Sequence, residues 1–234
     1  MLELFFYLLL LVLIGVILYV YHFALKKTGT KRRKVKIVRV LSGMAGWFLY
    51  LFLMSKSGIL DNFELPPRFP LLIILPLFLF IGIVLYRNRN HLLLMAIPAS
   101  WPVYFQSFRI WVELLLLGTY LKGFTPVETT FEGYNFEIVF AITALLVGYL
   151  AFNRKLLGGK VVIAWNFLGL AMLATIVFIF MTAIFFPTFW NSDVPLVGPE
   201  FTQFPYIFVA GFFMPLAVFV HLLSIIQLNR KKNI

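Results

Sequence analysis

Seven long apolar runs constrain this chain more than any other feature of its sequence. They cover approximately residues 2–25, 37–54, 69–86, 101–120, 138–152, 161–186 and 205–228. A helix of about 20 apolar residues crosses the hydrocarbon core of a bilayer, whereas the strands of a membrane barrel would alternate polar and apolar residues. These runs do not alternate. The sequence therefore predicts an all-α fold, a single polytopic membrane domain over residues 1–234 built as a bundle of seven transmembrane helices.

The composition excludes a soluble fold. Of the 234 residues, 62% are hydrophobic and 12% are charged, whereas a typical soluble domain carries about 25% charged residues. A chain of this length cannot bury so much apolar surface within itself, so much of that surface must face lipid. The absence of Cys excludes disulfides, thiolate metal ligands and cysteine nucleophiles.

The distribution of charge predicts the orientation. Sixteen of the 20 Lys and Arg residues fall in residues 26–39, 87–89, 154–160 and 230–232, which lie at alternate junctions of the runs and after run seven. These segments contain no Asp or Glu, and the alternate segments hold eight of the nine acidic residues. Positive charge accumulates on cytoplasmic loops, which predicts an outside N-terminus and a cytoplasmic C-terminus. Run one has no basic residues before it, so we expect a retained helix and not a cleaved signal peptide.

The net charge of +11 follows mainly from this asymmetry. Lys31, Arg32, Arg33 and Lys34 form the densest basic cluster. The cluster is either a topology signal or a contact for anionic lipid or a partner protein. Nothing resembles a nucleic-acid-binding domain, so no nucleic-acid partner is predicted. The expected surroundings are the lipid bilayer, with a membrane-protein partner or a second copy of the chain as open alternatives.

Run four contains two charged residues, Arg109 and Glu113, inside the predicted membrane core. At 100° per residue, Gln106 and Tyr120 lie on the same face of the helix, together with Pro102. Ionised groups within a bilayer usually face the bundle interior or a wet cavity, and a spacing of four allows a direct Arg109–Glu113 ion pair. Two interpretations stay open. Arg109 and Glu113 are a buried structural pair that holds run four against other helices, or they line a substrate or proton path in which Arg109 holds an anion and Glu113 exchanges a proton.

The segment between runs four and five mixes acidic, aromatic and turn-forming residues. One interpretation is a capped turn, with Asn135 as the N-cap of the next helix and Glu137 in its first turn. The other is a lid over the polar face of run four, in which Glu132, Tyr134 and Asn135 contact a ligand. Both place this segment outside the membrane.

Residues 108–113 (FRIWVE) and 130–136 (TFEGYNF) together resemble a pattern in uncharacterised bacterial multi-pass membrane proteins. The resemblance is confined to this stretch of the chain. It implies a bacterial inner membrane as the location, and it brings no activity with it.

Other polar, small and ring-constrained residues carry weaker expectations. His22 and His221 could in principle ligate a haem, but their depths differ and no flanking motif supports one, so we expect hydrogen-bonded or interfacial histidines and no cofactor.

Asn166 and Gln227 are expected to be interfacial anchors or interhelical hydrogen-bond donors. Prolines should interrupt the helices before run four and within run seven; these are Pro98, Pro102 and Pro215. Small residues are expected at close helix contacts; these are Ser42, Gly46, Gly169, Ala210 and Gly211.

Several functions can be separated at this stage. Retinal proteins have seven helices, but no lysine lies inside a predicted span to form a Schiff base. The HExxH motif, the Gly-x-Ser-x-Gly elbow and an intramembrane Asp pair are all missing from the sequence, so no metal site is predicted and an enzyme is not the favoured class. Arg109 and Glu113 could serve acid–base chemistry on a lipid, but no residue pattern indicates a nucleophile. The polar face of run four favours a transporter or channel-like protein for a small solute, anion or proton. The alternative is a sensor, assembly factor or complex subunit in which Arg109 and Glu113 are structural.

Overall fold

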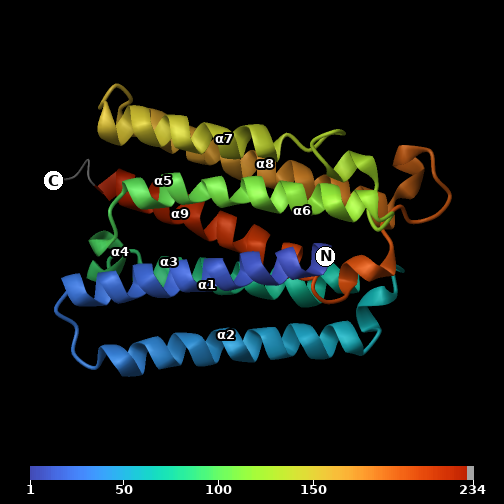
Figure 1. Ribbon diagram of the computed structural model, residues 1–234, viewed down its shortest axis with the longest axis horizontal. Helices are drawn as coiled ribbons and strands as arrows, with labels where there is room; N and C mark the ends of the chain where they lie inside the picture. The colour runs from blue at the N-terminus through green and yellow to red at the C-terminus, as the bar shows by residue number, and fades with distance from the viewer. Residues whose placement is uncertain (231–234) are drawn as a thin grey trace.

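The computed structural model describes residues 1–230, which form an all-α bundle of long helices lying side by side (Figure 1). Five helical segments are long and apolar enough to cross a membrane, the pattern of a multi-pass membrane protein. They are α1 (Leu2–Lys27), α2 (Arg33–Lys56), Pro70–Asn88, α8 (Gly159–Phe185) and Val209–Arg230. Pro70–Asn88 consists of a π-helical turn, Pro70–Ile74, followed by α3 (Leu75–Asn88), and Val209–Arg230 consists of a second such turn, Val209–Phe213, followed by α9 (Met214–Arg230).

Runs four and five are helical but interrupted. Run four comprises α5 (Ser100–Phe105), a 3₁₀ turn (Gln106–Phe108) and α6 (Arg109–Leu121). Run five comprises α7 (Glu137–Gly148) and a π-helical turn (Tyr149–Asn153), a shorter apolar helix. The predicted break before run four is confirmed, since α4 (Leu92–Ala96) ends just before Pro98. Pro102 lies in the first turn of α5, where its missing N–H costs no helical hydrogen bond.

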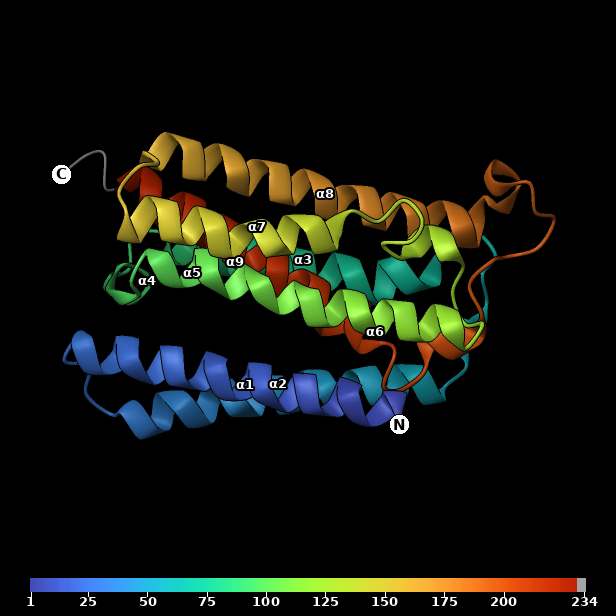
Figure 2. The same cartoon turned by 45° about the horizontal axis from the view of Figure 1, so that its top comes forward.

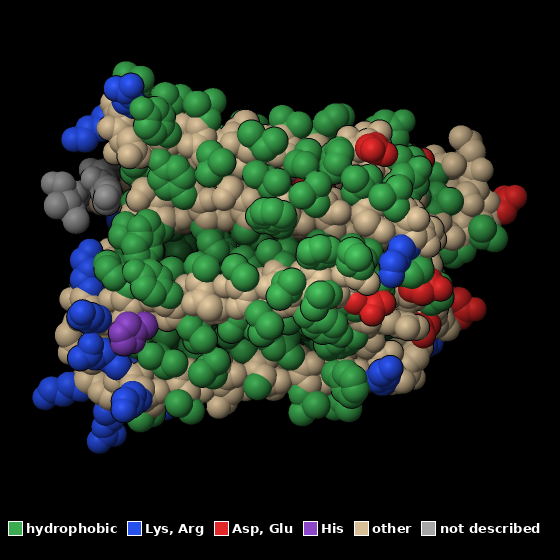
Figure 3. All heavy atoms as spheres, viewed as in Figure 1, with side chains coloured by type: hydrophobic (Ala, Val, Ile, Leu, Met, Phe, Trp, Pro, Cys, Tyr) green, Lys and Arg blue, Asp and Glu red, His purple; other side chains and the backbone are tan. Residues whose placement is uncertain are grey.

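Charged side chains are segregated to the two ends of the bundle. Lys and Arg gather at the end where α1 meets α2 and α7 meets α8, and Asp and Glu gather at the opposite end (Figure 3). The flank between them is covered by hydrophobic side chains, many of them exposed, as at Leu8, Phe80 and Ile142. This surface suits contact with lipid. The basic cluster at residues 31–34 is exposed at the basic end, and Lys231 and Lys232 lie outside the described residues.

Two glycines end helices and set the direction of the chain. Gly29 after α1 and Gly123 after α6 have φ of +64° and +76°, a conformation that glycine adopts without strain. In both, the N–H of the residue after the glycine bonds a carbonyl five residues earlier: Thr30 to Leu25 at 3.1 Å and Phe124 to Thr119 at 3.0 Å. This is the Schellman arrangement. At Gly123 it turns the chain back toward the bundle.

Two prolines in the helices leave carbonyl groups that α2 then satisfies. Pro76 and Pro215 lack the N–H that would bond the carbonyl four residues earlier. The Tyr50 hydroxyl donates to the Leu72 carbonyl at 3.0 Å, and Trp47 Nε1 donates to the Gly211 carbonyl at 2.8 Å. The predicted interruption of run seven is confirmed, because a π-helical turn, Val209–Phe213, precedes Pro215. These two bonds tie α2 to the helices that contain the prolines.

Removing the Tyr50 hydroxyl tests this arrangement. Tyr50→Phe is expected to lower the free energy of unfolding in detergent by about 0.5–1.5 kcal/mol, because the Leu72 carbonyl loses a donor. Pro76→Ala restores a backbone N–H, so the same Tyr50→Phe change should cost less in that background. Tyr86→Phe is the control, since Tyr86 is 66% exposed. An equal loss in both backgrounds would show that the proline is irrelevant.

The predicted close contacts hold for part of the set. A Cβ added at Gly169 would overlap His221 and Phe140, and one at Gly211 would lie 2.9 Å from Leu51 Cδ1, so both predictions are confirmed. Ala210 is buried as well. The prediction is wrong for Gly46, which has open space where a Cβ would be, and for Ser42, which is exposed on α2. Their face of the helix is turned away from the bundle.

Candidate functional site

Arg109 forms a buried ion pair with Glu137 across two helices. Arg109 is the first residue of α6 and Glu137 the first residue of α7, and their side chains are each 3% exposed. The predicted ion pair between Arg109 and Glu113 is therefore wrong: the carboxylate that pairs with Arg109 is that of Glu137. The cause is the position of α7, whose first turn lies beside Arg109 and supplies a carboxylate from a neighbouring helix.

Glu113 instead accepts a hydrogen bond from Asn135. Asn135 Nδ2 donates to Glu113 Oε2 at 2.6 Å and to the Thr129 carbonyl at 3.0 Å, while its Oδ1 accepts from the Glu137 N–H at 3.1 Å. The prediction of Asn135 as the N-cap is wrong by one residue, because Phe136 directly precedes the helix; Asn135 lies one residue earlier and bonds the N–H of the first helical residue. One buried amide thus holds Glu113 and fixes the start of α7.

His221 on α9 extends the network. Arg109 Nη1 lies 3.1 Å from His221 Nε2, and His221 Nδ1 lies 2.9 Å from Asn166 Oδ1. A guanidinium can only donate, so Nε2 accepts and the proton is assigned to Nδ1, which makes the imidazole neutral. The expectation of a hydrogen-bonded histidine is confirmed, and an interfacial one is wrong, since His221 is fully buried. His22 is exposed on α1.

Polar residues continue from His221 toward the basic end of the bundle. Asn166 Nδ2 donates to Ser224 Oγ at 3.0 Å, which confirms the predicted interhelical role of Asn166. Gln227 Nε2 donates to the Leu94 carbonyl at 2.6 Å and to the Ile97 carbonyl at 3.0 Å, both freed by the break at Pro98. Asn166 and Ser224 therefore join α8 to α9, and Gln227 joins α9 to α4 and the residue that follows it.

The chain between α6 and α7 folds inward. Because Glu137 meets Arg109, residues 122–136 must return from the end of α6 to its beginning, about 18 Å for twelve residues of helix. Figures 1 and 2 show this connection beside α6 and α8. The expectation of Glu137 in the first turn of the next helix is confirmed, but this turn lies buried beside Arg109 and not at the end of the bundle. We call residues 122–136 the inward segment.

The inward segment satisfies its polar groups internally. Thr129 and Thr130 are fully buried, and their hydroxyls donate to the carbonyls of Pro126 at 2.7 Å and Val127 at 2.8 Å. The Asn135 N–H bonds the Thr130 carbonyl at 3.1 Å. Irregular backbone at membrane depth is tolerated where protein buries it or where it lines a cavity. The segment meets this condition.

The structure brings together only some of the residues proposed from sequence. Asn135 contacts Glu113, whereas Glu132 is exposed and Tyr134, also exposed, places its ring 5.6 Å from that of Trp190. Gln106 is fully buried, and its Nε2 donates to the Ala217 carbonyl at 3.0 Å. Tyr120 is partly buried near the end of α6 and is not among the described residues that line the cavity beside Arg109.

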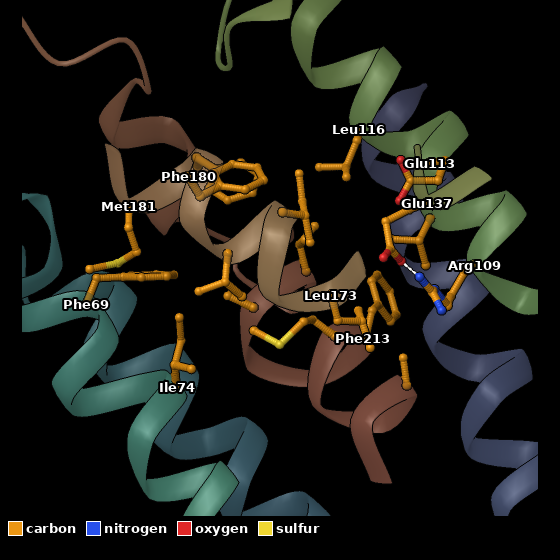
Figure 4. Close-up of a pocket in the computed structure, with 18 of the residues that line it drawn as sticks. Phe69, Ile74, Arg109, Glu113, Leu116, Glu137, Leu173, Phe180, Met181 and Phe213 are labelled. Atoms are coloured by element: carbon orange, nitrogen blue, oxygen red, sulfur yellow. Dashed lines mark ion pairs between the residues drawn. The ribbon is translucent and has the colours of Figure 1, made fainter. Parts of the chain in front are cut away.

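A cavity of about 70 Å³ lies beside the ion pair. Its charged lining residues are Arg109, Glu113 and Glu137. The rest of its lining is apolar and comes from α6, α8, Phe201, the segment before α3, and α9 with the π-helical turn that precedes it. Figure 4 shows the three charged groups on one side and Phe69, Ile74, Phe180 and Met181 on the other. The cavity is therefore charged at one end and apolar at the other.

The charges at this end do not balance. One guanidinium faces two carboxyl groups, and the neighbouring His221 is neutral, so one negative charge remains when both carboxyls are ionised. Within residues 1–230, the buried atoms without a hydrogen-bond partner include Arg109 Nε and Glu137 Oε1. Buried polar groups are normally satisfied, so these atoms mark a place where a proton, a water molecule or a ligand group completes the site.

Glu137 and His221 are site residues that the sequence patterns did not predict. Glu137 directly precedes an apolar run, which is the position of a loop or first-turn residue. His221 gives no signal by itself, yet it lies three residues from Ser224, which lies three from Gln227, a polar stripe along one face of run seven. That spacing is the signal that could have found it.

No protein-family model, curated protein or solved structure matches this chain. The membrane class therefore rests on the five apolar helices, and the candidate site rests on the buried Arg109–Glu137 pair.

Proposed function

We propose that the chain crosses the membrane seven times, with its N-terminus outside and its C-terminus in the cytoplasm. The support is that the helical segments of runs four and five lie alongside the five long apolar helices, and that basic and acidic side chains gather at opposite ends (Figure 3). Basic ends face the cytoplasm. The resemblance at residues 108–113 and 130–136 favours a bacterial inner membrane.

Cysteine labelling tests this topology without background, because the chain has no Cys. Lys31 and Asp193 are exposed at the two ends. With a membrane-impermeant maleimide on intact cells, Asp193→Cys should react and Lys31→Cys should react only after lysis. The reverse pattern, or labelling of both in intact cells, would contradict the orientation.

We infer that the protein transports a proton or a small cation, with Glu113 and Glu137 as the site. The observation that carries this proposal is the excess of carboxyl over guanidinium groups at a buried cavity. Arg109 is already paired with Glu137, so it is not free to hold an anion as the sequence alone suggested. Uncompensated negative charge inside a membrane is costly, so the site favours a group that brings one positive charge.

The surrounding fold supports transport. The first turn of α7 starts inside the bundle, as in transporters whose interrupted helices place their ends at a substrate site. Glu113 is joined through Asn135 to the inward segment on the acidic side, and Arg109 is joined to His221, Asn166 and Ser224 on the basic side. Polar groups thus extend from the cavity toward both ends.

Flux through proteoliposomes tests the proposal. Glu113→Gln removes the unbalanced charge while Asn135 can still hydrogen-bond the side chain, so proton or cation flux should fall by at least about tenfold. Glu132→Gln, an exposed acid of the inward segment, should leave flux unchanged. Equal flux through the wild type, Glu113→Gln and protein-free liposomes would overturn transport.

A non-transport role is the second candidate, favoured by one observation. Both ring nitrogens of His221 and the amide of Asn166 are hydrogen-bonded within the bundle, as in a network that locks helices together. A sensor or complex subunit would show no flux in any variant. It would also co-purify with a defined membrane protein in stoichiometric amounts, and loss of that partner on Glu113→Gln would support this role.

A further inference from the structure

We propose that a groove between α1 and α5 binds one acyl chain of an anionic phospholipid, with the phosphate of the lipid at Lys26 and Lys27. We call it the α1–α5 groove. Its lining residues are different from those of the cavity beside Arg109, so this site goes beyond the proposed transport and does not depend on it.

The α1–α5 groove lies where α1 separates from its neighbours. At the basic end of α1, Lys27 Nζ donates to the Ala96 carbonyl at 3.1 Å, and at the opposite end Leu2 packs closely against Gly118 of α6. Between these two contacts, α1, α5 and α9 enclose a cavity of about 540 Å³ that is open on one side. Figure 3 shows the surface hollowed between α1 and α5, next to the basic end.

The length of the α1–α5 groove matches one leaflet of a bilayer. Its lining on α1 runs from Leu9 to Val20, a rise of about 16 Å along the helix. Half of a hydrocarbon core is about 15 Å thick. The groove therefore covers the leaflet at the basic end and stops near the middle of the membrane. A transmembrane helix of a partner would have to continue past this point, whereas an acyl chain ends there.

The lining of the α1–α5 groove suits a hydrocarbon chain. Leu13 and Phe105 are typical of it, because most of the lining side chains are apolar. The polar side chains in its middle bond within the protein: Ser107 Oγ donates to the Tyr104 carbonyl at 2.9 Å, and the Tyr104 hydroxyl donates to Asn153 Oδ1 at 2.7 Å. An apolar chain thus covers these side chains without breaking a hydrogen bond, and its burial is favourable.

Two lysines give the groove a charge that complements an anionic lipid. Lys27 lies one heptad beyond Val20 and Lys26 one heptad beyond Tyr19, so both continue the face of α1 that lines the groove. Both lysines are exposed, and neither forms an ion pair within residues 1–230. The ammonium of Lys27 keeps N–H donors beyond the one that bonds Ala96. Basic side chains between helices at this side of a membrane favour anionic headgroups.

Aromatic side chains mark the membrane interface at the same end of the groove. Trp101 begins the lining on α5, and its ring lies 6.1 Å from that of Tyr19 and 4.8 Å from that of Phe23. Trp and Tyr are enriched at the depth of the lipid headgroups. A lipid whose chain fills the groove would therefore have its phosphate beside these rings, within reach of Lys26 and Lys27.

Titration of lipids in a neutral detergent tests the class of ligand. The probes are dioleoyl phosphatidylglycerol, dioleoyl phosphatidylcholine and glycerol phosphate, each titrated against the thermal unfolding midpoint of the full chain. Phosphatidylglycerol should bind at least about fivefold more tightly than phosphatidylcholine, since one lysine near a headgroup contributes about that factor. Glycerol phosphate, which has no acyl chain, should not bind. Equal affinity for the two lipids, or binding of glycerol phosphate as tight as that of phosphatidylglycerol, would overturn the proposal.

Paired variants locate the headgroup. Lys26→Gln combined with Lys27→Gln should remove the preference for phosphatidylglycerol and leave phosphatidylcholine binding unchanged. Lys31→Gln combined with Lys34→Gln is the matched control, because it removes the same charge from exposed positions beyond α1 and should keep the preference. Loss of the preference in the control alone would place the headgroup outside the groove and overturn the assignment.

Val16→Phe locates the acyl chain. Val16 lines the groove and is partly exposed, so the larger side chain should fill the groove, leave both lysines in place and weaken both lipids by about tenfold or more. If the Lys26 and Lys27 double variant does not fold, Val16→Phe decides alone, and wild-type lipid binding in it overturns the site. Conversion of a wild-type dimer to a monomer by Val16→Phe, with lipid binding unchanged, would assign the groove to a second copy of the chain and also overturn the proposal.

Discussion

Arg109→Met is expected to lower the free energy of unfolding by about 3–5 kcal/mol, a large part of the stability of a domain of this size. The substitution leaves two buried carboxyl groups without a cation, and it removes the donor to His221 Nε2. Breaking one side of a buried ion pair costs far more than replacing both sides. The measurement is thermal or denaturant-induced unfolding of the purified protein in detergent.

Arg154→Met is the matched control. Arg154 is exposed near the start of the α7–α8 connection, where its Nε donates to the Tyr149 hydroxyl at 2.7 Å. Solvent replaces this bond, so the change should cost no more than about 0.5 kcal/mol. Equal stability of Arg109→Met and Arg154→Met would show that the Arg109–Glu137 pair is not buried as described.

Gly169→Val is the second substitution with a large expected effect. A Cβ at position 169 would overlap the imidazole of His221 and the ring of Phe140, neither of which can move without disturbing Arg109. Overpacking of this kind costs about 1–3 kcal/mol, and displacement of His221 adds a lost hydrogen bond to it. A lowered unfolding midpoint with wild-type helix content by circular dichroism is the expected result.

Gly46→Val provides the comparison within another long helix. Gly46 has no atom within 4 Å of an added Cβ, so the side chain would point into open surroundings. Valine and glycine differ little in helix propensity, so the change should be within about 0.5 kcal/mol of neutral. If Gly169→Val is tolerated as well as Gly46→Val, the close approach of α8 and α9 at His221 is wrong.

The helices could be predicted from sequence because the bilayer constrains them locally. Apolar run length marked α1, α2 and α8 within a few residues of their ends, and glycine and proline marked several interruptions. The position of the fifth helix was harder to predict. A helix that starts inside the bundle and a short helix that starts at the surface have the same apolar pattern in the sequence. Only tertiary contact of Glu137 with Arg109 distinguishes the two.

The candidate site could be predicted only in part, because most of its contacts join residues that are far apart in the sequence. Arg109 and Glu113 were evident because charge is rare in an apolar run. Their partners come from three other segments, and sequence spacing reports only on neighbours along one helix. The i,i+4 rule therefore joined Arg109 to Glu113, while packing joined Arg109 to Glu137 and His221.

The most direct test of the buried network asks which carboxyl group is coupled to Arg109. Double-mutant cycles would combine Arg109→Met with Glu137→Gln and, separately, with Glu113→Gln, and would measure the free energy of unfolding for each variant. The coupling free energy with Glu137 should exceed that with Glu113 by about 1 kcal/mol or more, because Glu137 forms the ion pair. A coupling with Glu113 as large as that with Glu137, or larger, would contradict the assignment.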